Sequence, residues 1–118
     1  MDLTIDLDEE NGALSIIAAG SYTLKDMMEL IQVVHNECEA RAMCRAIIDL
    51  TGLTGDFPIL DRFTIGKRMS EVIGPRIKIA VVALPDMVNR LAENTARNRG
   101  TRIRTFFTRN EAMEWLDS

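Results

Sequence analysis

The sequence predicts one α/β domain over residues 1–118, with its elements in the order β-β-α-β-α-β-α-β-α around a mostly parallel five-stranded sheet. Three observations support this fold class. An Asn-Gly turn joins the first two strand-like segments, helix-like and strand-like periods alternate afterwards, and the run IKIAVVAL is nearly all apolar, as in a covered parallel strand. Strands that alternate with helices require right-handed crossovers, so helices must cover the sheet.

The N-terminal segments predict a hairpin followed by a helix. Apolar and polar residues alternate near residues 2–7 and 13–19, and the turn between these segments pairs them antiparallel. From Thr23 to Cys38 the apolar residues recur at helical spacing instead. Thr23 with Asp26 resembles a capping box, so the first helix begins there.

The middle of the chain predicts a buried strand, a loop and a second helix. The β-branched run at residues 44–50 is typical of a short buried strand, and a loop rich in Thr and Gly follows from Thr51 to Asp56. Pro58 suits the first turn of the next helix, which Gly74-Pro75 ends.

The C-terminal part predicts two further strand and helix pairs. A strand at residues 77–84 leads to a helix that starts at Pro85 and Asp86 and ends before Gly100. The next strand, RIRTFF, places Arg102 and Arg104 where charges protect a sheet edge. Thr108 and Glu111 then form a capping box for the last helix.

The composition excludes several classes of protein. Apolar residues make up 47% and charged residues 27% of the chain, as in an ordinary globular domain. The net charge of −4 argues against a nucleic-acid binder that depends on phosphate neutralisation. No apolar run reaches the roughly 20 residues of a membrane span, and the acidic N-terminus is unlike a signal peptide, so we expect a cytoplasmic protein. Cys38 and Cys44 are too few for a disulfide framework, and we expect both to be small buried hydrophobes.

Charge is divided unevenly between the two halves of the chain. Residues 1–59 carry 11 acidic and 3 basic side chains, and residues 60–118 carry 7 and 11, which gives −8 and +4. This asymmetry favours a dipolar surface for a partner or an anionic ligand. Solvated helix faces and protected sheet edges are the commoner explanation of such an asymmetry.

The loops after the parallel strands define the candidate site. They must leave the sheet at the same edge, where α/β proteins usually bind ligands. The candidate binding residues in and beside these loops are Tyr22, Asp49, Thr51, Gly52, Thr54, Gly55, Asp56 and Asp86.

The segment TGLTGD permits two interpretations. Hydroxyls, flexible backbone and a following helix N-terminus are the ingredients of an anion site, although the lysine of a P-loop is missing. Alternatively, Gly52 and Gly55 satisfy turn dihedrals and Asp56 caps the helix. Asp49 ends a strand where catalytic carboxylates often sit, but such residues also brace loops. No spacing of His, Cys, Asp or Glu predicts a metal site, and we expect no cofactor.

Four segments together resemble the STAS superfamily, the sulfate transporter and anti-sigma factor antagonist domains. They are GSYTLKDMMELI, AIIDLTGLTG, RIKIAVVAL and RTFFTRNEAMEWL. Within the superfamily the chain is most similar to small bacterial stand-alone proteins described as STAS-like or CRAL-TRIO-like. The resemblance spans almost the whole chain. It implies four right-handed βα units with an added antiparallel edge strand, and mostly non-enzymatic work through binding.

The resemblance also implies a place for a phosphoswitch. In anti-sigma factor antagonists, a D-S-S-G-like segment after the strand that matches IIDL carries a phosphorylatable Ser at the start of the next helix. The corresponding segment here, TGLTGDFPILD, has no Ser, so Thr51 and Thr54 are the candidate hydroxyls. A phosphate on Thr54 would lie close to the charge of Asp56, which offsets the benefit of the helix dipole.

Three functional hypotheses follow. The first is a non-catalytic STAS-like module that binds a partner protein or a small ligand at the strand-ending loops. The second is a carrier of a lipid or other apolar ligand, as the CRAL-TRIO likeness suggests, in a pocket lined by Met27, Met28, Met69 and Met87; methionines also fill ordinary cores. The third is a small hydrolase or phosphotransfer enzyme that uses Asp49 or Asp56. An exposed edge strand or helix face leaves a homodimer open.

Overall fold

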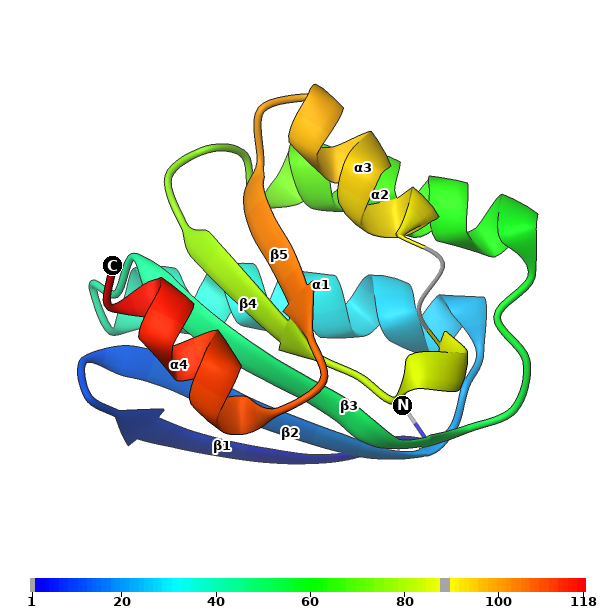
Figure 1. Ribbon diagram of the computed structural model, residues 1–118, viewed down its shortest axis with the longest axis horizontal. Coiled ribbons are helices and arrows are strands. Elements are labelled where there is room, and N and C mark those ends of the chain that lie inside the picture. The colour runs from blue at the N-terminus through cyan, green and yellow to red at the C-terminus, as the bar shows by residue number, and fades with distance from the viewer. Residues whose placement is uncertain (1, 88–89) are drawn as a thin grey trace.

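The computed structural model describes residues 2–87 and 90–118, in which five strands form one sheet in the order β1-β2-β3-β4-β5 (Figure 1). The strands are β1 (Thr4–Glu10), β2 (Ala13–Ser21), β3 (Arg45–Thr54), β4 (Lys78–Val82) and β5 (Arg102–Phe106). β1 pairs antiparallel with β2, and every later neighbour is parallel. The predicted hairpin, the parallel sheet and the order of strands and helices are confirmed.

Helices cover both faces of the sheet. They are α1 (Leu24–Ala40), α2 (Ile59–Val72), α3 (Leu91–Asn98) and α4 (Arg109–Leu116), with a 3₁₀ turn, η1 (Pro85–Met87), before α3. Figure 1 shows α1 behind the sheet and α4 in front of it. Side chains of α1, α2 and α3 share one buried cluster with the sheet, and those of α4 share a smaller cluster on the opposite face.

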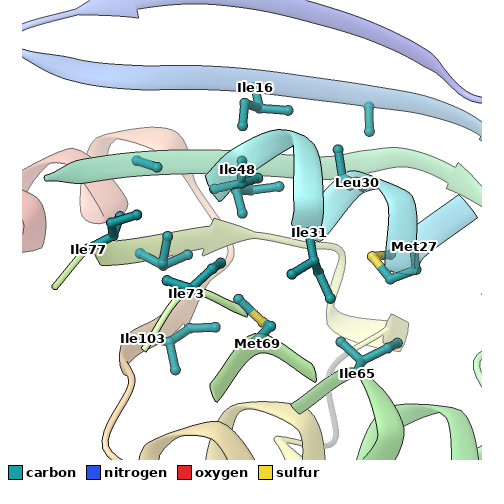
Figure 2. Packing of buried hydrophobic residues seen from close by; sticks show 14 of the residues in the cluster. Ile16, Met27, Leu30, Ile31, Ile48, Ile65, Met69, Ile73, Ile77 and Ile103 are labelled. Carbon is teal, nitrogen blue, oxygen red and sulfur yellow. The ribbon is translucent and has the colours of Figure 1, made fainter. Parts of the chain in front are cut away.

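The larger core is built almost entirely from aliphatic side chains and methionine. Figure 2 shows Met27 and Ile31 of α1 and Ile65 and Met69 of α2 directed into the same layer beneath the sheet. The smaller core lies under α4, where Ala112 and Leu116 pack on β3 and β4. Because each face of the sheet has its own apolar layer, the central strands are buried on both sides, as the sequence predicted.

The predicted starts of the first and last helices are confirmed. The Thr23 hydroxyl accepts a hydrogen bond from the Asp26 amide at 3.1 Å. Thr108 Oγ1 accepts from the Glu111 amide at 3.3 Å, as in the predicted capping box, and the same hydroxyl donates to the Glu111 carboxylate at 2.9 Å.

The predicted end of the strand at residues 44–50 is wrong, because β3 continues through Thr54. The register shifts between Ile17, opposite Asp49, and Ala19, opposite Gly52, so β3 carries a bulge. Asp49 Oδ1 accepts hydrogen bonds from the amide of Thr51 at 2.9 Å and from its hydroxyl at 2.6 Å. The Thr and Gly residues that suggested a loop therefore accommodate a bulge inside a strand.

Gly52 is a strand residue whose small size permits a close approach. A Cβ at this position would lie 2.9 Å from the Cβ of Ala19 and 3.1 Å from the carbonyl oxygen of Ala18. The prediction that Gly52 satisfies a turn dihedral is wrong, whereas Gly55 does adopt a positive φ of 101° just after the strand.

Two predicted helix starts also differ from the structure. Asp56 does not cap α2, because the N-cap residue is Pro58 and no side chain caps that end. Pro85 and Asp86 begin the turn η1 instead of an α-helix, and α3 begins at Leu91 after Arg90, whose φ is 63°. A left-handed residue interrupts helical geometry, which separates the turn from the helix. The predicted helix also included residues 88 and 89, which lie outside the described residues.

The predicted burial of both cysteines is half correct. Cys38 is buried in the larger core, but Cys44 is exposed in the connection before β3. Cys44 lies one residue before β3 begins, so it does not share the burial of the residues inside that strand.

Candidate binding site at the carboxyl edge of the sheet

The ends of the parallel strands bring three loops together at one edge of the sheet. Tyr22 follows β2, Phe57 follows β3, and η1 follows β4. The amide of Tyr22 donates to the carbonyl of Thr54 at 2.8 Å, so the first two loops leave the sheet as hydrogen-bonded neighbours.

Tyr22 connects its loop to the start of α2. Its hydroxyl donates to Asp61 Oδ2 at 2.9 Å, and its ring lies 4.1 Å from that of Phe57, tilted by 31°. Burial and the hydrogen-bonded Asp61 carboxylate both raise the pKa of the Tyr22 phenol. The neutral phenol is therefore part of the folded architecture and holds the loop onto the helix.

Arg62 connects the second loop to the third. Its Nε donates to the carbonyl of Phe57 at 2.8 Å, and its Nη1 donates to the carbonyl of Met87 at 2.7 Å. The guanidinium also lies 5.7 Å from the centre of the Phe57 ring. A planar donor with fixed geometry is well suited to bridging two carbonyl groups. Tyr22, Phe57, Asp61, Arg62 and Met87 together form what we call the edge network.

Five large apolar side chains are exposed on α2 and in the loops that follow β4 and β5. Large apolar side chains are exposed at Ile59 (68%), Leu60 (80%) and Phe63 (45%) of α2, at Leu84 (46%) after β4, and at Phe107 (50%) after β5. We call these five residues the apolar edge surface. In the described part of the chain, the remaining exposed large apolar side chain is Ile17, in the middle of β2.

Helical geometry explains why α2 exposes apolar residues. Ile65, Met69 and Ile73 recur every four residues and are buried. Phe63 precedes Ile65 by two positions, which is a rotation of roughly 200° about the helix axis, so it points away from the sheet. The helix thus has one apolar face in the core and a second apolar face in solvent at its N-terminal end.

The structure distributes the sequence-predicted site residues over three environments. Tyr22 belongs to the edge network, as described above. Asp49, Thr51 and Gly52 lie in the bulge of β3, where Asp49 and Thr51 bond to each other. The remaining candidates, Thr54, Gly55, Asp56 and Asp86, are exposed at the ends of the strands.

The sequence reasoning missed Phe57, Asp61, Arg62 and Met87, which complete the edge network. In the sequence, each of them looks like an ordinary residue of a loop or of a helical turn. They form one network because three loops meet in the folded chain, and the spacing of residues along one helix does not predict this meeting. The proline at the N-cap of α2 was the one available signal, because it places the first helical turn directly against the preceding loops.

A cavity of about 100 Å³ lies between the sheet and helices α1, α2 and α3. Met27, Met69 and Met87 are among the residues that line it, whereas Met28 packs elsewhere on the larger core. Phe57, Arg62 and Met87 belong to both the cavity wall and the edge network. Typical ligand pockets measure about 300–1,000 Å³, so this cavity is small.

The described residues also bear on metal and membrane binding. In residues 2–87 and 90–118, no group of three or more His, Cys, Asp or Glu side chains is arranged to hold a metal ion. None of the helices in these ranges has the length and apolar character needed to cross a bilayer.

Comparison with known proteins identifies the fold. No family model and no curated protein matches the sequence. A crystal structure of an anti-sigma factor antagonist from Mycobacterium paratuberculosis is similar with a TM-score of 0.69 and 16% identity, covering 99% of this chain and 96% of that one. The chain therefore has the fold of that antagonist, as the resemblance to the STAS superfamily implied.

Two further solved structures agree. An uncharacterized protein of the DUF3478 family from Shewanella loihica, described as having a SpoIIAA-like fold, matches with a TM-score of 0.61 and 18% identity, covering 97% of this chain and 93% of that one. The solution structure of the protein TM1081 matches with a TM-score of 0.56 and 17% identity, covering 94% and 86%. The SpoIIAA-like fold thus extends over nearly the full length of the chain.

The titration of Tyr22, the single tyrosine, tests the edge network. We expect its phenolate absorbance to appear at higher pH in the folded protein than in the unfolded chain, where the pKa is about 10. Because the folded pKa is raised, the phenol stabilises the fold fully below pH about 10, and this stabilisation is lost as the pH rises further.

Asp61→Asn should lower the midpoint of this titration while burial keeps it above the ordinary value. Asp56→Asn, which changes an exposed carboxylate of the preceding loop, is the matched control and should leave the midpoint unchanged. A phenol that titrates at its ordinary pKa in the folded wild-type protein would show that the network does not form.

Proposed function

We propose that this chain is a non-catalytic binding module and that a partner protein docks on its apolar edge surface. The observation that supports this proposal is that five of the six exposed large apolar side chains of the described residues lie in the first turns of α2 or in the loops that follow β4 and β5. Burying a Leu, Ile or Phe side chain contributes about 1.5–3 kcal/mol, so the apolar edge surface offers a large gain to a partner that covers it. Partner proteins use such clusters as the centres of their interfaces.

The edge network supports the same proposal because it fixes the backbone beneath the surface. Ile59, Leu60 and Phe63 flank Asp61 and Arg62, whose side chains are engaged with the neighbouring loops. A surface held in one conformation loses less entropy on binding than a mobile loop does. Asp56 and Asp86 are exposed beside it, which favours a partner with basic residues around an apolar centre.

The solved anti-sigma factor antagonist provides a further argument for a protein partner. Its name describes action on a protein factor, and it shares its fold with this chain over nearly the whole length. Fold alone does not determine function, so the argument rests first on the surface itself.

The contacts of Asp49 and the two threonines argue against an enzyme and a phosphoswitch. Asp49 Oδ1 already accepts two hydrogen bonds from Thr51 inside the bulge, which favours a bracing role for the carboxylate. Thr51 and Thr54 lie within β3, and α2 begins only at Ile59. Neither threonine therefore belongs to the first turn of α2, where the helix dipole stabilises a negative charge.

The cavity argues against a carrier of whole lipids. A volume of about 100 Å³ is well below that of ordinary ligand pockets, and a lipid would require α1, α2 and α3 to separate. Protein docking at the exposed surface requires no such rearrangement.

Substitution of the apolar edge surface tests the proposed function. The double variant Leu60→Ser with Phe63→Ser should fold normally, since both side chains are exposed. It should bind the partner at least ~100-fold more weakly, because central apolar residues of an interface each contribute about 2 kcal/mol or more. The partner is isolated by affinity capture from the source organism, purified, and measured by calorimetry.

Ile17→Ser is the matched control, since Ile17 is 41% exposed but belongs to β2 and not to α2, which carries both substituted residues. Its affinity should stay within about twofold of the wild type. Equal affinity for the double variant and the wild type would overturn the proposal. Light scattering at several concentrations should accompany this measurement, because loss of a dimer in the double variant would identify a second copy as the partner.

The non-catalytic assignment is tested separately. A screen for Mg²⁺-dependent phosphatase, esterase and phosphotransfer activities should give no turnover that depends on Asp49. An activity present in the wild type and removed by Asp49→Asn, with the fold intact, would contradict the assignment.

A further inference from the structure

The cavity between the sheet and the helices has a wall that is mostly apolar. Side chains from every element around it contribute, among them Ile31 of α1, Ile65 of α2, Val81 of β4 and Ile103 of β5. Figure 2 shows Ile31, Ile65 and Met69 directed toward one another across this layer. Close packing is the rule in protein interiors, so an unfilled volume of this size marks a site where a small molecule fits.

The charged groups in the wall, Glu93, Arg90 and Arg62, already make hydrogen bonds or ion pairs. Glu93 accepts a hydrogen bond from the amide of Thr105, and its Oε2 forms an ion pair with Nη1 of Arg90 at 3.3 Å. Arg62 donates to two backbone carbonyls of the edge network, as described above. A charged ligand would lose its hydration, and an anion could pair with Arg62 only by competing with these two hydrogen bonds, which is costly.

We propose that this cavity binds a small uncharged apolar molecule about the size of one aromatic ring. In another protein, a dry cavity of roughly 150 Å³ lined by Leu, Ile and Phe binds benzene. The cavity here has about 100 Å³ and a similar wall, with the side chains of three methionines that adapt to the shape of a ligand. This site is separate from the protein-docking surface, and binding to it does not depend on the proposed partner.

The NMR signals of Tyr22 can report ligand binding in the cavity. Phe57 lines the cavity, and its ring lies 4.1 Å from the ring of Tyr22. A bound aromatic molecule changes the magnetic environment of Phe57 and its neighbour. The Tyr22 ring protons are identifiable because the chain has one tyrosine.

Titration of the purified wild-type chain with benzene, toluene and benzoate tests the proposal. Benzene and toluene should bind saturably, shift the Tyr22 ring resonances, and raise the folding equilibrium constant about elevenfold at ten times Kd. Benzoate, which adds a charge to the same ring, should bind at least ~10-fold more weakly. Absence of saturable binding up to the solubility limit of benzene, or equal binding of benzoate, would overturn the proposal.

Two variants and two larger ligands locate the site. Ala92→Leu enlarges a side chain of the cavity wall and should weaken benzene binding at least ~10-fold, whereas Ala40→Leu makes the same change at an exposed position of α1 and should have no effect. If Ala92→Leu does not fold, naphthalene decides the question in the wild type, because two fused rings exceed the cavity. Binding of naphthalene or palmitate as tight as that of benzene would contradict the proposed size limit and favour a lipid carrier.

Discussion

One guanidinium group holds the carboxyl edge of this protein together. Arg62 donates hydrogen bonds to the carbonyls of Phe57 and Met87, which belong to loops that follow two different strands. Hydrogen bonds from a charged donor contribute about 1.5–3 kcal/mol each, enough to fix two short loops. Tyr22 joins the third loop to the same helix through Asp61. The apolar edge surface depends on this arrangement, because its residues on α2 lie on either side of Asp61 and Arg62.

β3 connects the sheet to the edge network. The bulge at Asp49 and Thr51 lets the strand continue to Thr54, where it hydrogen bonds to the loop that carries Tyr22. A strand that ended at Asp49 would leave that loop without this partner. The larger core contains the cavity of about 100 Å³, and Phe57, Arg62 and Met87 line this cavity as well as forming part of the edge network. The exposed surface and the interior volume are therefore two features of one structural unit.

The sequence predicted the fold well because periodicity and capping are local. The capping box at Thr108, the apolar run of β4 and the hairpin at the start were all visible in short segments. The end of β3 was not, because Thr and Gly within TGLT favour a loop until β2 supplies hydrogen bonds and a bulge. The strand-ending loops do meet at one edge of the sheet, as predicted, but Arg62, which bridges two of them, was missed. Its role arises from the positions of two carbonyls in distant parts of the chain, which no pattern along one helix encodes.

Arg62 holds the loops of the edge in one conformation, and amide hydrogen exchange of the variant Arg62→Met measures whether these loops open without it. The amides of Tyr22 and Met87 are hydrogen bonded to the carbonyls of Thr54 and Leu84. Both should exchange roughly tenfold faster or more in the variant, a change of about 1.4 kcal/mol in local opening. The amide of Ala112, in the first turn of α4 on the opposite face of the sheet, should keep its protection. Unchanged exchange at Tyr22 and Met87, or equal loss of protection at Ala112, would contradict the account.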